Sequence, residues 1–177
     1  SNIKRADLVV VNKVLEEGEI QRVRKRIHPQ VCFTRMLADA FVAFADGREV
    51  PVHEMDRSPC VLISAVGNNM HVAQQVGRMG LSIVRHYTFR DHTYFKPSQI
   101  ERVVKRYERV ASKKVYIKPP IILTTEKDYV RMLGDPELMA RTEGYPFYYL
   151  RVQLELLRGE RTFERAFQQF TGEAIAP

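Results

Sequence analysis

Short apolar runs without polar alternation recur along this chain, and they constrain its fold more than any other feature. They are clearest at residues 60–66 and 121–124. Runs of this kind are typical of strands that are buried on both faces of a parallel sheet. A helical pattern near residues 69–79 links the first run to a further strand at residues 81–87. Residues 60–87 therefore predict a β-α-β unit.

The same alternation of strand and helix continues toward the C-terminus. Ser98-Gln99-Ile100-Glu101 and Thr125-Glu126-Lys127-Asp128 each have the spacing of a capping box, which opens a helix. Residues 145–156 predict a strand, and residues 163–170 carry apolar side chains at helical spacing. Right-handed crossovers fit these lengths, so residues 57–177 predict an α/β lobe with a mostly parallel sheet flanked by helices.

The first third of the chain has a different pattern. Residues 6–13 predict a buried strand and residues 16–28 an amphipathic helix, which ends at Pro29. Residues 31–55 form two extended stretches around an Asp-Gly pair, which is a strong signal for a hairpin. We expect residues 1–30 to be part of a larger lobe, residues 31–56 to be a β-hairpin linker and residues 57–177 to be the main lobe.

Charge and cysteine content narrow the classes of function. Lys and Arg outnumber Asp and Glu by 28 to 21, and the net charge of +7 favours an anionic partner such as phosphate, nucleic acid or an acidic membrane. Cys32 and Cys60 have no metal-ligand spacing, so we expect neither a disulfide framework nor a zinc site. No apolar run approaches the roughly 18 residues of a membrane span, so we expect the chain itself to be soluble.

A candidate site lies where the predicted strands end. Ligands in open α/β sheets bind outside the carboxyl ends of the strands, where the loops 67–69, 88–95 and 125–128 are expected. Asp91 and His92 place a carboxylate beside an imidazole, which suits proton transfer from a sugar hydroxyl. The alternatives are a capping Asp with a surface His, or a metal site that also uses His86.

Lys127 is the unusual residue of the third loop. The capping box already explains Thr125 and Asp128. A cation in the first turn of a helix opposes the helix dipole, so Lys127 is expected to reach an anion or to pair with Asp128 or Glu126.

One motif is absent from the sequence. No Gly is followed by Lys, so the G-x-x-x-x-G-K-[ST] cradle for ATP phosphates does not occur in these 177 residues. We therefore expect that the chain by itself does not bind ATP well.

Three segments in order resemble the tetraacyldisaccharide 4'-kinase family, the lipid A 4'-kinases. They are residues 61–68, 86–95 and 122–128, and residues 5–13 also look like a strand of that family. The resemblance implies a three-layer, P-loop NTPase-like α/β fold of two lobes joined by a two-stranded ribbon. Residues 31–56 would be that ribbon, and residues 1–30 would close the first lobe.

The resemblance also implies an activity. Family members transfer the γ-phosphate of ATP, with Mg²⁺, to the 4'-hydroxyl of a tetraacyldisaccharide 1-phosphate at the cytoplasmic face of the bacterial inner membrane. By this analogy Asp91 and His92 are the catalytic pair, with His92 assisting an Asp of the N-terminal lobe, and Lys127 and Asp128 contact the cofactor. No metal ligand is implied. The implied partners are the lipid A disaccharide precursor and an anionic membrane surface, not nucleic acid, and nothing indicates the oligomeric state.

The chain departs from the family in what it contains. The family's N-terminal half, with its Walker A loop, is not in these 177 residues, so we expect the isolated chain to be inactive as a kinase. Two other functions stay open from the sequence. One is a basic nucleic-acid-binding module, suggested by the net charge of +7 and by nine Phe and eight Tyr. The other is a metal-dependent phosphohydrolase that uses His86, Asp91 and His92.

Overall fold

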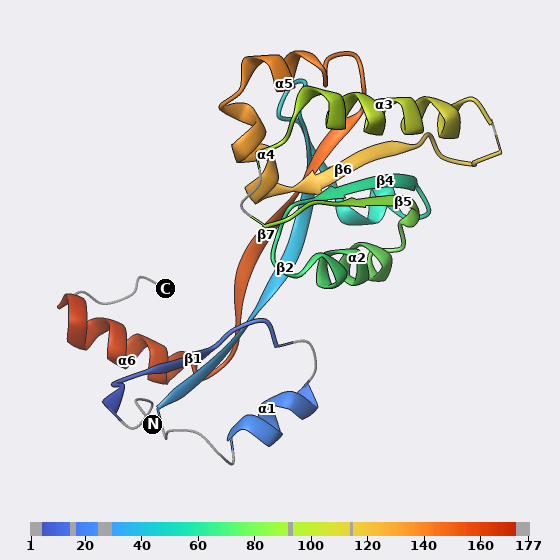
Figure 1. Ribbon diagram of the computed structural model, residues 1–177. Helices are drawn as coiled ribbons and strands as arrows, with labels where there is room; N and C mark the ends of the chain where they lie inside the picture. The colour runs from blue at the N-terminus through green and yellow to red at the C-terminus, as the bar shows by residue number, and fades with distance from the viewer. Residues whose placement is uncertain (1–4, 15–16, 25–29, 92–93, 114, 173–177) are drawn as a thin grey trace. The chain divides into compact units, whose positions relative to one another are not determined.

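The computed structural model describes residues 5–14, 17–24, 30–91, 94–113 and 115–172 (Figure 1). By their contacts, the residues group into two compact units. Unit 1 consists of residues 1–37 and 153–177, and unit 2 consists of residues 38–152.

The strands of unit 2 confirm the mostly parallel sheet. Strands β4 (Pro59–Ser64) and β5 (Ser82–Thr88) pair in parallel, and β4 also pairs in parallel with β6 (Ile121–Thr125). Strand β6 pairs in parallel with β7 (Phe147–Arg158). The strand order is β1-β2-β7-β6-β4-β5. The carboxyl ends of β4, β5 and β6 therefore lie at one edge of the sheet.

Helices cover both faces of the unit 2 sheet, which confirms the three-layer α/β architecture. Helices α3 (Pro97–Ala111), α4 (Glu126–Leu133) and α5 (Pro136–Ala140) share one buried apolar cluster with Ile63 of β4. Helix α2 (Asn69–Arg78) shares the other cluster with the neighbouring Leu62. Figure 1 shows α2 and α3 on opposite sides of the sheet. Alternate residues of a buried strand face opposite layers, which explains the unbroken apolar run.

The hairpin expected around the Asp-Gly pair is present. Strand β2 (Val31–Ala43) pairs antiparallel with β3 (Glu49–Pro51), and a 3₁₀ helix follows at Val52–Met55. Gly47 has a φ of +68°, a left-handed conformation that suits glycine. The amide of Ala43 donates to the carbonyl of Arg48 (2.9 Å), which closes the turn.

Unit 1 contains the first part of β2 (residues 31–37) and the last part of β7 (residues 153–158). Strand β1 (Val9–Val11) pairs in parallel with β2, and helices α1 (Glu17–Arg24) and α6 (Glu160–Thr171) complete the unit. The strands that continue from one unit into the other are β2 and β7. The residues after 152 thus group with the first 37, whereas the sequence placed them in the main lobe. The lobe boundaries themselves stay a prediction.

Two local expectations have different outcomes. The capping box expected at Ser98–Glu101 is wrong, because α3 begins earlier, at Pro97, with Lys96 as its N-cap residue. Proline is favoured at the first helical position, and the Gln99 side chain accepts a hydrogen bond from the amide of Lys96 (2.8 Å). The cap at Thr125 is confirmed, since its hydroxyl accepts from the amide of Asp128 (3.2 Å).

Cys32 and Cys60 are buried free thiols. None of the helices among the described residues is both long and apolar enough to cross a membrane.

Candidate functional site

The three loops singled out in the sequence meet at the carboxyl edge of the unit 2 sheet. The amide of Phe89, after β5, donates to the carbonyl of Ser64 at the end of β4 (2.8 Å). A Cβ atom on Gly67 would lie 3.2 Å from Oδ2 of Asp91. The amide of Ala65 donates to Asp128 of α4 (2.9 Å). The ends of three neighbouring strands are thus in direct contact.

Asp128 is an internal residue of this edge. Its side chain is completely buried, with 0 % exposed. One carboxylate oxygen accepts from the amide of Ala65 (2.9 Å) and the hydroxyl of Thr125 (2.8 Å), and the other accepts from Arg131 (3.1 Å). A buried carboxylate with this many donors ties α4 to the end of β4.

Arg131 is a site residue that the sequence analysis missed. Its Nη1 donates to the carbonyl of Ala65 (2.9 Å) and to Asp128 (3.1 Å), and its Nη2 lies 3.7 Å from Oδ1 of Asp91. Only 17 % of its side chain is exposed. Its position three residues after Asp128, on the same face of a helix, is the signal that could have indicated it.

Lys127 pairs with an anion, as its placement in the helix required. Its Nζ lies 3.4 Å from Oδ1 of Asp91, so the partner is on the β5 loop and is neither Asp128 nor Glu126. Half of the Lys127 side chain is exposed, and a third of the Asp91 side chain. Asp91 is therefore a carboxylate held by two cations and still reached by water.

The remaining candidates differ in what the structure shows. His92 lies outside the described residues. His86 lies on β5, where its Nε2 is 2.6 Å from the hydroxyl of Ser64, and burial lowers the pKa of its imidazole. In the described part of the chain, no group of three His, Cys, Asp or Glu side chains is arranged to hold a metal ion.

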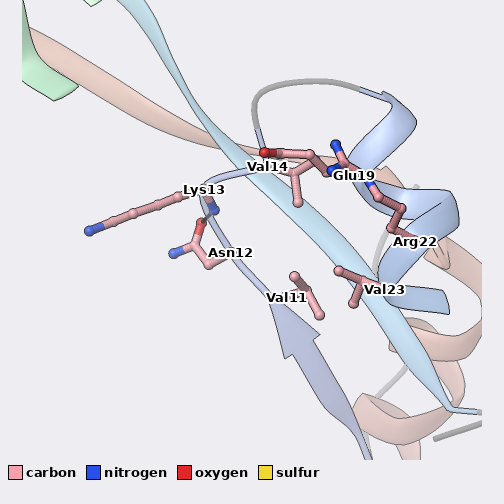
Figure 2. A pocket seen from close by; sticks show the side chains of 7 residues that line it. All are labelled: Val11, Asn12, Lys13, Val14, Glu19, Arg22 and Val23. Carbon is pink, nitrogen blue, oxygen red and sulfur yellow. Dashed lines mark hydrogen bonds between the residues drawn. The ribbon is translucent and has the colours of Figure 1, made fainter. Parts of the chain in front are cut away.

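Unit 1 contains a pocket that the sequence analysis did not foresee. It lies after β1 and has a volume of about 290 Å³ (Figure 2). Lys13, at its edge, has a φ of +63°, and Figure 2 shows its side chain pointing away from the other lining residues. Oδ1 of Asn12 accepts from the amide of Lys13 (2.6 Å) and from the hydroxyl of Thr34 (3.1 Å). The lining residues are Val11, Asn12, Lys13, Val14, Glu19, Arg22 and Val23.

This pocket combines apolar walls with a few polar groups. Three valines supply the walls, and an amide, a carboxylate and a guanidinium supply the polar atoms. Both hydrogen bonds of Asn12 described above go to its oxygen, Oδ1, so its Nδ2 amino group, which can only donate, takes no part in them. Such a lining suits a small heterocycle with polar edges.

Comparison with known proteins gives a consistent group of relatives. The chain is 25 % identical to the tetraacyldisaccharide 4'-kinase of Pelodictyon phaeoclathratiforme, covering 92 % of the chain and 45 % of that protein. It is 26 % identical to that of Chlorobium limicola, covering 90 % and 43 %. It is 27 % identical to a probable mitochondrial tetraacyldisaccharide 4'-kinase of Arabidopsis thaliana, covering 87 % and 40 %. The chain thus spans less than half the length of these curated relatives.

One solved structure is similar, the crystal structure of the apo form of LpxK from Aquifex aeolicus in complex with ATP. It is 19 % identical, with a TM-score of 0.45, and the match covers 93 % of this chain and 44 % of that one. The family model described as tetraacyldisaccharide-1-P 4'-kinase matches residues 1–171. Because that match extends over almost the whole sequence, the chain belongs to the tetraacyldisaccharide-1-P 4'-kinase family.

Proposed function

We propose that this chain is part of an enzyme that transfers the γ-phosphate of ATP to the 4'-hydroxyl of tetraacyldisaccharide 1-phosphate in lipid A biosynthesis. Family membership supports the reaction. The observation that carries the proposal is Asp91, a water-accessible carboxylate between Lys127 and Arg131 at the carboxyl edge of a parallel sheet.

The residues of this edge divide into three roles in the proposed reaction. Phosphoryl transfer depends mainly on positioning and on neutralising charge. By the family resemblance, Asp91 and His92 act as a pair, and His92 helps an Asp from elsewhere in the enzyme to take the proton of the sugar hydroxyl. Lys127, which is half exposed, contacts the anionic phosphoryl group. Asp128 is buried and fully engaged, so it positions Arg131 and the Ala65 backbone and does not touch the nucleotide.

The unit 1 pocket, taken by itself, is proposed to receive a planar heterocycle. Its valines can pack against a purine, and Nδ2 of Asn12 can donate to a ring nitrogen. Mg²⁺ is expected to accompany the ATP phosphates. Among the described residues, no group of three His, Cys, Asp or Glu side chains is arranged to hold this ion.

The proposed partners are the lipid A disaccharide precursor and an anionic membrane surface at the cytoplasmic face of the inner membrane. The net charge of +7 suits such a surface. By themselves the 177 residues contain no Gly-Lys phosphate loop, so the isolated chain is proposed to be inactive. ATP-dependent phosphorylation of the disaccharide by the isolated chain would contradict this part of the proposal.

The central test replaces His92 by Ala in the full-length kinase. Turnover should fall about 10²–10⁴-fold if the imidazole handles a proton in the reaction. His53→Ala is the matched control, because His53 is an exposed histidine of the same unit outside the site, and its turnover should stay within about twofold of the wild type. Unchanged turnover in His92→Ala would reduce Asp91 and His92 to a structural loop, and a wild-type protein without 4'-kinase activity would refute the function.

A further inference from the structure

A buried serine at the end of β4 links two other polar side chains. The side chain of Ser64 is 0 % exposed. Its hydroxyl lies 2.6 Å from Oδ1 of Asn69 on α2 and 2.6 Å from Nε2 of His86 on β5. The three residues form a continuous hydrogen-bonded chain between two elements that flank β4.

The donor and the acceptor in each hydrogen bond among these three side chains follow from the backbone groups that contact Asn69. Asn69 accepts from the amide of Val66 through Oδ1 (3.4 Å) and donates through Nδ2 to the carbonyl of Phe89 (3.4 Å). An amide N–H only donates and a carbonyl only accepts, so the orientation of the Asn69 side chain is fixed. Ser64 must then donate its one proton to Asn69. His86 in turn must donate its Nε2 proton to Ser64.

The same contacts set the spacing of the two loops at the candidate site. The hydrogen bond from Asn69 to the Phe89 carbonyl joins the start of α2 to the end of β5, and the amide of Phe89 donates to the backbone carbonyl of Ser64 (2.8 Å). Gly67, two residues before Asn69, and Asp91, two residues after Phe89, approach so closely that a Cβ on Gly67 would lie 3.2 Å from the Asp91 carboxylate. The three linked side chains thus contact the backbone of the loop after β5, which carries Asp91.

We propose that His86 is a positioning residue that, as an Nε2–H donor acting through Ser64 and Asn69, holds the β5 loop so that Asp91 stands beside Gly67. The role of Asp91 rests on the proposed function, but the state of His86 does not. Because burial lowers the pKa of His86, its imidazole favours the neutral form, in which only one nitrogen carries the proton. A neutral donor in a fixed tautomer makes a stable link, since it does not change charge when the site binds an anion.

The first experiment tests the hydrogen-bonded chain without any assay of activity. Nitrogen-15 NMR of the 177-residue chain, labelled at histidine, reports which ring nitrogen is protonated. We expect the Nε2–H tautomer for His86 at neutral pH, and Ser64→Ala should remove the protection of that proton from exchange with water. An Nδ1–H tautomer, or a charged imidazolium, would overturn the inference even if the kinase is active.

The second experiment compares three variants in the full-length kinase. His86→Gln keeps an N–H donor at the distance of Nε2, whereas His86→Asn places one only at the distance of Nδ1, and His86→Phe has none. We expect kcat within about threefold of the wild type for Gln and roughly 10–100-fold lower for Asn and Phe, with less change in KM for ATP, because misplacing a catalytic group by about 1 Å has effects of this size.

The outcomes of the second experiment separate the alternatives. A kcat of His86→Gln no higher than that of His86→Phe would show that His86 acts by changing its protonation. A kcat of His86→Asn equal to that of the wild type would show that the hydrogen bond to Ser64 does not matter for the reaction. Either result overturns the inference. A wild-type enzyme without activity would refute the proposed function, while the NMR result would still decide the state of His86.

Discussion

Replacing Asp128 by Ala should destabilise unit 2 more than the loss of any ordinary helix cap. Asp128 is completely buried and accepts hydrogen bonds from the Ala65 amide, the Thr125 hydroxyl and Arg131. Removing one partner of a buried ion pair costs about 3–5 kcal/mol, because the other charge is left without compensation. Arg131 keeps some exposure and still lies 3.7 Å from Asp91, so the lower limit of about 3 kcal/mol is expected.

The assay follows from where the tyrosines lie. The chain has no Trp, and all eight Tyr fall within residues 38–152, so intrinsic fluorescence reports on unit 2 alone. With a urea m-value of about 2 kcal/mol per molar, a loss of about 3 kcal/mol lowers the urea midpoint by about 1.5 M. Asp128→Asn keeps one acceptor oxygen and should fall between Asp128→Ala and the wild type, which provides a readable variant if Ala does not fold.

Asp135→Ala is the matched control for this prediction. Asp135 also stands at the N-terminus of a helix, where it accepts from the amides of Glu137 (3.0 Å) and Leu138 (3.2 Å), but it binds no cation in these contacts. Loss of such a cap costs about 1 kcal/mol, or about 0.5 M in the urea midpoint. If the midpoint of Asp128→Ala fell no further than that of Asp135→Ala, the buried carboxylate would not be what holds the strand ends together.

Three further outcomes can be checked. Gly67→Ala, whose Cβ would lie 3.2 Å from Asp91, should lower turnover of the full-length kinase about tenfold, and a normal kcat would refute the close approach. Gly159→Ala should lower the free energy of unfolding, followed by circular dichroism, by about 2–5 kcal/mol, because φ is +90° and the Cβ would lie 2.7 Å from the Val31 carbonyl. Gly172→Ala is the control: its φ is +72° but no atom lies within 4 Å of the Cβ, so the loss should be about 1 kcal/mol. Equal losses in the two variants would contradict this prediction. The hydrogen bond from Arg151 holds the pKa of Asp39 below its usual range in the folded protein. The pair therefore contributes its full stabilisation above the unfolded-state pKa of about 3.9, and this stabilisation is lost as the pH falls through the lower folded-state pKa. Arg151→Leu should therefore lower the urea midpoint more at pH 7 than at about pH 2.5, and equal shifts would show that the pair contributes nothing.

The sequence predicted those features that depend on neighbouring residues. The apolar runs of β4 and β6 indicate burial on both faces, because successive side chains of a strand point to opposite layers. The Thr125 cap is recognisable because its donor and acceptor are three residues apart. At α3 two local signals competed, and the proline at position 97 placed the start of the helix before the Ser98 pattern.

Features that depend on distant residues could not be predicted. Lys127 was expected to find an anion, but its partner Asp91 lies 36 residues earlier, and only the packing of β5 against β4 brings the two together. The neighbouring positions of β2 and β7 in the sheet likewise join segments more than 100 residues apart, so the expected linker included only one of these two strands. The pocket after β1 has no periodic signal, because its lining comes from the end of β1, the residues that follow it and the short helix α1.

The pair formed by Asp128 and Arg131 is difficult to explain by stability alone. Taking both charges out of water costs about as much as their attraction returns, and an apolar pair of similar size often stabilises a fold as well or better. Arg131, however, contacts the backbone carbonyl of Ala65, the carboxylate of Asp128 and the carboxylate of Asp91, which belong to three different segments. An apolar side chain could fill the same space but could not fix the direction of the Asp91 carboxylate. The pair is therefore better explained by its part in orienting the Asp91 carboxylate of the candidate site.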